Sequence, residues 1–130
     1  MPLLPDLAAI DGAQSLYDWF DYWPSFHDAE ILHLHLNRSG SSLMAVHTWH
    51  MTSNTDEKGF YILEKHIVVD FVLEGISDLQ LIQFSHQNVV FGLEIKKKND
   101  GFVLVLSPCY GLAGTIEVSK ISIRLHPGQP

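Results

Sequence analysis

The sequence of 130 residues contains one cysteine, Cys109, so no disulfide framework can form within it. It has no apolar run near the roughly 20 residues that a membrane helix requires. Residues 1–6 lack the basic start and long apolar run of a signal peptide. We therefore expect a cytoplasmic chain that contacts no membrane. With 46% hydrophobic residues, the chain is too apolar to be disordered.

Positive charge is also scarce in this sequence. Fifteen Asp and Glu residues stand against eight Lys and Arg, the formal net charge is -7, and no Lys or Arg precedes Arg38. The one basic run, residues 96–98, stands before a turn and is typical of a solvated strand end. A nucleic-acid partner requires many cations against its phosphates, so we expect none. Residues 1–37 would instead attract a basic protein.

The spacing of apolar residues changes along the chain. Leu16, Trp19 and Phe20 follow helical spacing and Pro24 stops a helix, so we predict one short helix over residues 13–20. After Phe26, apolar and polar residues alternate between turn signals, which is typical of strands. The first begins near Leu32, and the others are predicted at residues 43–51, 60–73, 79–84, 89–97, 102–107 and 115–126.

These elements predict an α+β fold that is mainly β. We expect one short N-terminal helix packed on a largely antiparallel sheet of six or seven strands, because the connections between the strands are short. No linker, repeat or low-complexity stretch divides the sequence. Residues 1–130 are therefore predicted to form a single domain, with a helix and junction over about 1–28 and a β-rich body over about 29–126.

Three histidines are predicted to share one face of the first hairpin. Alternation favours a register that pairs Leu36 with Met44, Leu34 with Val46 and Leu32 with Thr48. His33, His35 and His47 then lie on the other face, with His33 directly opposite His47. Because imidazole is the commonest metal ligand, one alternative is a small metal-dependent hydrolase that uses these three residues. Histidines beside a Trp on a sheet are more often surface residues, so we expect no metal or other cofactor.

Other catalytic motifs are missing from the sequence. Residues 107–111, Ser-Pro-Cys-Tyr-Gly, do not match the Gly-x-Ser-x-Gly spacing of a nucleophile elbow. No nearby charge in the sequence lowers the pKa of a thiol at Cys109, and no glycine-rich loop for phosphate is present. We therefore expect that the protein is not an enzyme.

A motif follows the predicted helix. Its residues are Trp23, Pro24, Ser25, Phe26, His27, Asp28 and Glu30, with Ala29 between the last two. Together with the alternating strand over residues 32–36, this motif resembles the Imm50-type immunity proteins of bacterial polymorphic toxin systems. The resemblance implies a non-catalytic protein that binds and neutralises a cognate toxin. We expect the motif to be structural, with aromatic anchors and with Asp28 capping backbone groups.

The resemblance also implies a surface for the toxin. Many toxin domains in such systems are nucleases with basic surfaces, so a basic toxin is the expected partner. Exposed aromatic side chains and nearby carboxylates are the candidates for contact: Asp18, Asp21, Tyr22 and Trp49. A second alternative is a general interaction domain with no toxin partner.

Overall fold

The computed structural model describes residues 3–130, which form two short helices and one sheet of eight strands. The helices are α1 (Pro5–Ala8) and α2 (Ala13–Phe20). The strands are β1 (Glu30–His35), β2 (Ser42–Thr55), β3 (Tyr61–Glu74), β4 (Asp78–Ile82), β5 (Val89–Lys98), β6 (Gly101–Tyr110), β7 (Ala113–Val118) and β8 (Lys120–Pro127). Their order is β4-β7-β6-β5-β1-β2-β3-β8, and all neighbours are antiparallel. The predicted fold class is confirmed, with eight strands instead of six or seven.

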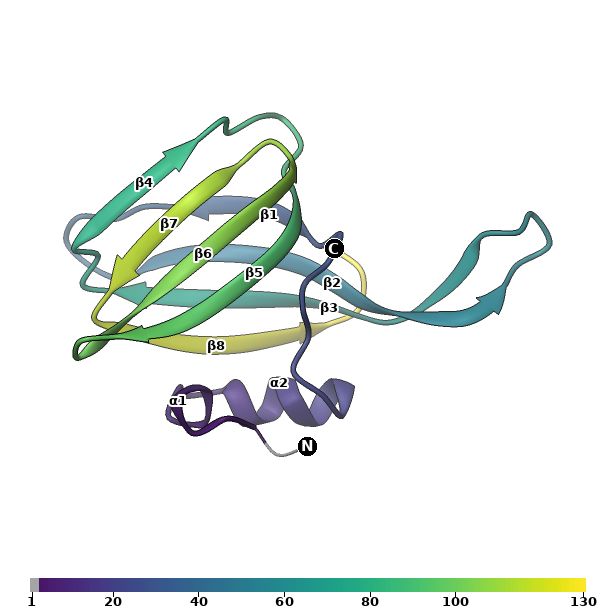
Figure 1. Cartoon of the computed structure of the whole chain (residues 1–130), viewed down its shortest axis with the longest axis horizontal. Coiled ribbons are helices and arrows are strands. Elements are labelled where there is room, and N and C mark those ends of the chain that lie inside the picture. The colour runs from purple at the N-terminus through teal and green to yellow at the C-terminus, as the bar shows by residue number, and fades with distance from the viewer. Residues whose placement is uncertain (1–2) are drawn as a thin grey trace.

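The sheet turns back on itself into two layers (Figure 1). Strands β4, β7, β6 and β5 form one layer, and β1, β2, β3 and β8 form the other. The predicted strand over 115–126 bends at Ser119, where the chain passes from β7 in the first layer to β8 in the second. A Cβ atom on Gly101 would lie 2.2 Å from the Val118 carbonyl oxygen, so only glycine fits beside this corner. The corner accounts for one additional strand.

The helices cover the β8 edge of the sheet. Helix α2 matches the predicted residues 13–20, whereas α1 is additional, and at four residues it is too short to show a helical period. Leu16 and Phe20 are buried against the core. The Ile123 N–H donates to the Asp11 carbonyl oxygen at 2.7 Å, and Asp11 forms an isolated bridge with Ser122. The N-terminal segment therefore protects an edge that would otherwise be open.

The register of the first hairpin differs from the prediction. Leu34 pairs with Met44 instead of Val46, and a bulge at Leu32 brings Ile31 opposite Val46. The predicted pairing of His33 with His47 is therefore wrong, because His33 lies opposite Ala45. Two features explain the difference. The Asn37 N–H donates to the Ser42 hydroxyl at 2.9 Å and tightens the turn, and the bulge places Ile31 in the core in place of Leu32.

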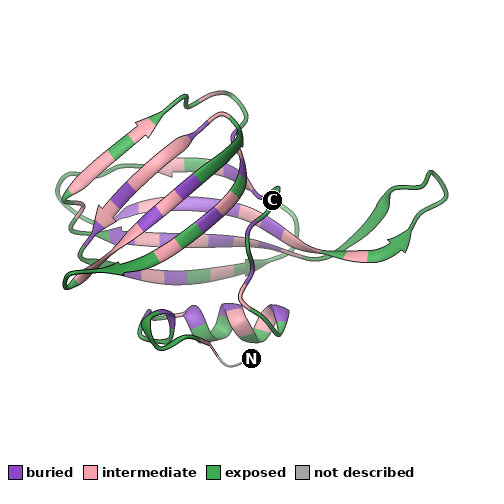
Figure 2. Ribbon diagram, in the orientation of Figure 1, coloured by how far each residue is buried: buried purple, intermediate pink, exposed green. Residues whose placement is uncertain are grey.

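Strands β2 and β3 extend beyond both layers as a two-stranded arm, which we define as residues 51–64 (Figure 1). Almost every residue of the arm is exposed (Figure 2). Met51 pairs with Leu63, and Thr55 pairs with Tyr61. At the tip, the Asp56 carboxylate accepts hydrogen bonds from the N–H groups of Lys58 and Phe60, at 2.9 and 3.0 Å. These bonds order the turn.

Candidate functional site

The junction motif begins with an aromatic anchor. Phe26 is 1% exposed, and its ring packs edge-on against Trp23 and Phe71, with centroids 6.5 and 5.7 Å apart. Phe26 and Asp28 both have left-handed backbone angles, with φ of 62° and 65°. These two sharp bends turn the chain from the helical segment into β1.

Backbone hydrogen bonds tie the same motif to β5. The Asp28 N–H donates to the Val90 carbonyl at 2.9 Å, and the Val90 N–H donates to the Ala29 carbonyl at 3.0 Å. The His27 Nδ1 lies 3.1 Å from the Phe91 carbonyl oxygen. Within residues 3–130 the Asp28 carboxylate accepts no backbone N–H, so the expected cap is not formed. It lies 3.6 Å from His27 Nε2 and 3.9 Å from the Cys109 sulfur.

A histidine pair lies on the outer face of β2 and β3, but it differs from the predicted cluster. His47 stacks on His66 with ring centroids 5.2 Å apart, and its Nε2 lies 3.1 Å from the His66 Nδ1. The centroid of a Trp49 ring lies 4.9 Å from the centroid of the His47 ring. Burial lowers the pKa of His47 and the neighbouring His66 lowers it further, while Glu30 acts in the opposite direction.

The hydrolase alternative requires His33, His35 and His47 to converge, but on their shared face His33 lies opposite Ala45 and His35 opposite Leu43, so neither directly faces His47. His33 and His35 are exposed on β1, while His47 contacts His66. No group of three or more His, Cys, Asp or Glu side chains in the described part of the chain is placed to hold a metal ion. Sequence reasoning missed His66, because its position beside His47 depends on the pairing of β2 with β3.

The carboxylates at the end of α2 lie beside the root of the arm. Asp18 and Asp21 are exposed, and none of the ion pairs among residues 3–130 includes either residue. The Trp19 Nε1 donates to the Lys65 carbonyl, and the Lys65 ammonium donates to the Trp19 carbonyl, both at 3.1 Å. These reciprocal bonds fix α2 to the arm.

Tyr22 makes a second contact between the helical segment and the arm. Its hydroxyl lies 2.6 Å from the His50 Nδ1, and burial raises the pKa of Tyr22. Of the four predicted contact residues, the structure therefore brings Asp18, Asp21 and Tyr22 to one place. Trp49 instead contacts His47 and His66 on the other face of β2.

An apolar row runs from Trp49, just before the arm, along the arm itself, and of its members the sequence analysis named only Trp49. Met51 lies directly opposite Leu63, and alternation places Tyr61 on the same face as Leu63 and Trp49 on the same face as Met51. We call these four residues the outer stripe. Met51, Tyr61 and Leu63 are 53%, 57% and 39% exposed. An apolar run such as residues 60–63 has the same sequence pattern whether or not a second layer of the sheet covers it.

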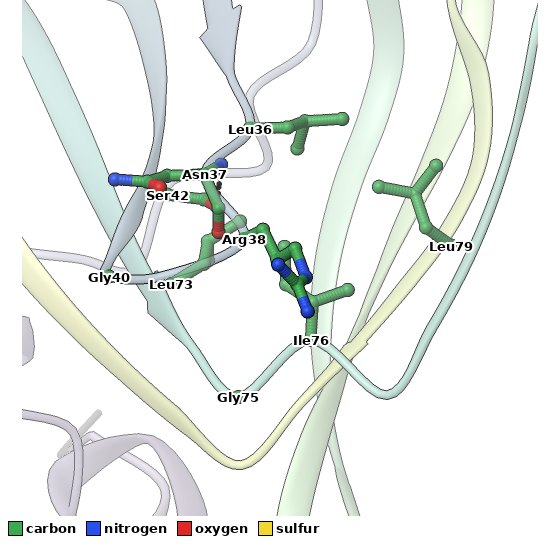
Figure 3. Close-up of a pocket in the computed structure, with 9 residues that line it drawn as sticks. All are labelled: Leu36, Asn37, Arg38, Gly40, Ser42, Leu73, Gly75, Ile76 and Leu79. Atoms are coloured by element: carbon green, nitrogen blue, oxygen red, sulfur yellow. Dashed lines mark hydrogen bonds between the residues drawn. The ribbon is translucent and has the colours of Figure 1, made fainter.

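A cavity of about 510 Å³ lies between the β1–β2 turn and the start of β4 (Figure 3). The side chains of Leu36 and Leu79 point toward each other across it, and the Arg38 guanidinium lies beside Ile76. Among the described residues that line the cavity there is no Asp, Glu, His or Cys. The Ser42 hydroxyl is the one potential nucleophile among these described residues, and none of them can act as the general base that would activate it.

Comparison with protein families decides between the interpretations. A model of the family described as immunity protein 50 matches residues 12–125, which include the junction motif, both layers and the arm. The chain belongs to this family. This immunity protein neutralises a cognate polymorphic toxin without catalysis, as the resemblance predicted. The hydrolase alternative and the alternative without a toxin partner are therefore wrong.

Two other comparisons found no further relatives of the immunity protein. Neither curated proteins nor solved structures gave a match. Across residues 3–130, neither helix is long and apolar enough to cross a bilayer. The surface that binds the toxin must therefore be argued from the geometry of this chain.

Proposed function

We propose that this immunity protein captures a basic toxin through the acidic end of α2, where Asp18 and Asp21 provide the attracting charges. The observation that carries the proposal is that residues 1–37 contain six carboxylates and no Lys or Arg. Both side chains are exposed, so their field extends into solvent, and Lys65, whose ammonium donates to the Trp19 carbonyl between them, offsets only part of it. Such a surface accelerates the encounter with a partner of opposite charge.

The distribution of cations supports this orientation. Lys96, Lys97 and Lys98 lie at the β5–β6 turn, on the opposite side of the body from the arm (Figure 1). Lys98 forms an ion pair with Glu117, and Lys120 lies 3.8 Å from Glu74, so acidic neighbours offset part of that positive charge. A basic toxin would therefore be attracted to the α2 side of the molecule and not to the turn.

The same proposal explains neutralisation by stoichiometric binding. A bound partner of ordinary interface size covers some 800 Å² on each protein, which is enough to block access to an active site. An acidic chain of this kind repels nucleic acid, so we propose no nucleic-acid partner. The exposed thiol of Cys109 suits a reducing compartment, and we place the complex in the cytoplasm.

The test measures the rate at which the cognate toxin domain, as an inactivated protein, associates with the Asp18→Asn/Asp21→Asn variant. Asn tolerates the left-handed backbone of Asp21, so the fold is retained. We expect the rate constant at low salt to fall about tenfold and its salt dependence to weaken, with the dissociation rate nearly unchanged.

A matched control removes two carboxylates elsewhere. The Glu94→Gln/Asp100→Asn variant changes the net charge by the same amount at the β5–β6 end, and we expect its association rate to stay within about twofold of wild type. Equal slowing by both variants would show that total charge matters and not the α2 surface. No slowing by either variant would overturn the proposal.

A further inference from the structure

The outer stripe is not part of the hydrophobic core. None of its residues, Trp49, Met51, Tyr61 and Leu63, belongs to the hydrophobic cluster that residues 3–130 form between the two layers. An apolar row exposed on a soluble protein marks an interaction site when it is contiguous and bordered by polar groups. Here the border consists of the polar tip at one end and the His47–His66 pair at the other.

The arm is also held in shape, although nothing packs on its faces. A two-stranded ribbon is only marginally stable in water by itself. At the tip, Asp56 orders the turn, and at the root the reciprocal bonds between Trp19 and Lys65 fix the direction in which the arm leaves the body. A bulge at Lys65, with φ of 54°, sets the twist at this point. Such preorganisation lowers the conformational cost of binding.

We infer that the outer stripe is the apolar anchor that binds the cognate toxin, by docking into a hydrophobic groove on the toxin. This inference rests on the proposed function, because it takes the basic toxin as the partner. The acidic end of α2 meets the root of the arm on the face opposite to the stripe, at the Tyr22–His50 contact, so one partner contacts both surfaces by wrapping around an edge of the ribbon. Aromatic and Met side chains inside a polar rim are typical of the centre of an interface.

The charge of the arm fits the same partner. The carboxylates Asp56, Glu57 and Glu64 outnumber the two lysines, Lys58 and Lys65, and Lys65 is engaged by the Trp19 carbonyl. A basic toxin gains attraction from these carboxylates as the stripe docks. A second copy of this chain would bring like charges together, which disfavours pairing between two arms.

The arm offers a matched pair of variants for the test. Leu63 belongs to the outer stripe, whereas Ile62 lies next to it on the opposite face with a similar exposure, 43% against 39%. Threonine suits a strand, so Leu63→Thr and Ile62→Thr each remove an apolar side chain without weakening the ribbon. The probe is the same inactivated toxin domain, and dissociation rates are measured by surface plasmon resonance at low and high salt.

We expect Leu63→Thr to raise Kd at least about tenfold, through a faster dissociation rate and equally at both salt concentrations. Adding Tyr61→Thr should extend the loss to about a hundredfold, while Ile62→Thr should change Kd by less than about threefold. Unfolding midpoints in urea should be alike for all three variants, which shows that lost binding is not lost folding.

Two results would overturn the inference. One is an equal change in Kd for Leu63→Thr and Ile62→Thr, since then the stripe has no special role. The other is a dimer of the free protein that Leu63→Thr dissociates, since then a second copy covers the stripe. Failure of the proposed function is seen separately, as an association rate that does not respond to Asp18→Asn/Asp21→Asn.

Discussion

The two ends of strands β2 and β3 have the same backbone pairing and opposite environments. At the body end, Met44, Val46, Val69 and Phe71 are fully buried, because the β4-β7-β6-β5 layer covers them. In the arm, the same two strands continue their hydrogen bonds with no layer above them. Burial in this molecule therefore depends on the second layer and not on strand formation. Apolar residues of the body stabilise the fold by burial, whereas those of the arm are exposed to solvent.

The largest expected effect is at the body end. Phe71→Ala removes a fully buried ring that packs on Phe26, so we expect a loss of about 3–5 kcal/mol in the free energy of unfolding. Tyr61→Ala, on the same strand but in the arm, should change it by less than about 0.5 kcal/mol. Urea unfolding followed by fluorescence measures both. Similar losses for the two variants would mean that the arm is part of the cooperative core.

An intermediate effect on the free energy of unfolding is expected at the junction motif. We expect His27→Ala to lower the free energy of unfolding by about 1 kcal/mol, because it removes the hydrogen bond to the Phe91 carbonyl. His33→Ala is the control, since the His33 side chain is also exposed and makes no hydrogen bond to any of residues 3–130. We expect toxin affinity to be unchanged in both variants. A loss of affinity in His27→Ala without a loss of stability would assign the motif a binding role instead.

The smallest effect is expected where β2 and β3 leave the body, at His47. Its pKa in the folded protein lies below the ordinary value of 6.5, because of burial and of His66, against the opposing effect of Glu30. The unfolded chain therefore binds the proton more readily. The contribution of neutral His47 to the free energy of unfolding is therefore complete above pH 6.5. It is lost as the pH falls from 6.5 through the lowered pKa of the folded state.

Urea unfolding over this pH range measures the effect, with His47→Gln as the comparison. We expect the unfolding midpoint of the wild type to fall more steeply with acidification than that of the variant. The same slope for both proteins would mean that protonation of His47 is not coupled to folding. Because His47 also borders the outer stripe, a slope that changes when toxin is bound would connect the histidine pair to the interface.

Much of the fold was predictable from local patterns. The spacing of Leu16, Trp19 and Phe20 predicted α2, and alternation predicted most strands. The corner at Ser119 was missed because no glycine or proline stands there. A signal did exist, since buried residues fall at even positions in β7, such as Ile116, and at odd positions in β8, such as Ile123. This change of phase marks the point where the strand crosses between layers.

The candidate site was predictable in its chemistry but not in its geometry. Composition pointed to an acidic N-terminal segment, and the motif from Trp23 to Glu30 pointed to the family, which the comparison confirms. The hairpin register failed because the tight turn closed by Asn37 and Ser42 shifts the pairing by two residues and the bulge at Leu32 shifts it by one more, and alternation alone reveals neither. The outer stripe was missed because exposure in a strand is decided by tertiary structure.

The contact between Asp11 and Ser122 joins the first helical segment to the last strand. A ribosome makes α2 early, yet the strand on which α2 packs is made only after all the others. During synthesis the apolar side of α2, with Leu16 and Phe20, therefore has no native partner until β8 has emerged. The packing of α2 on the sheet is therefore completed only after β8 has been made.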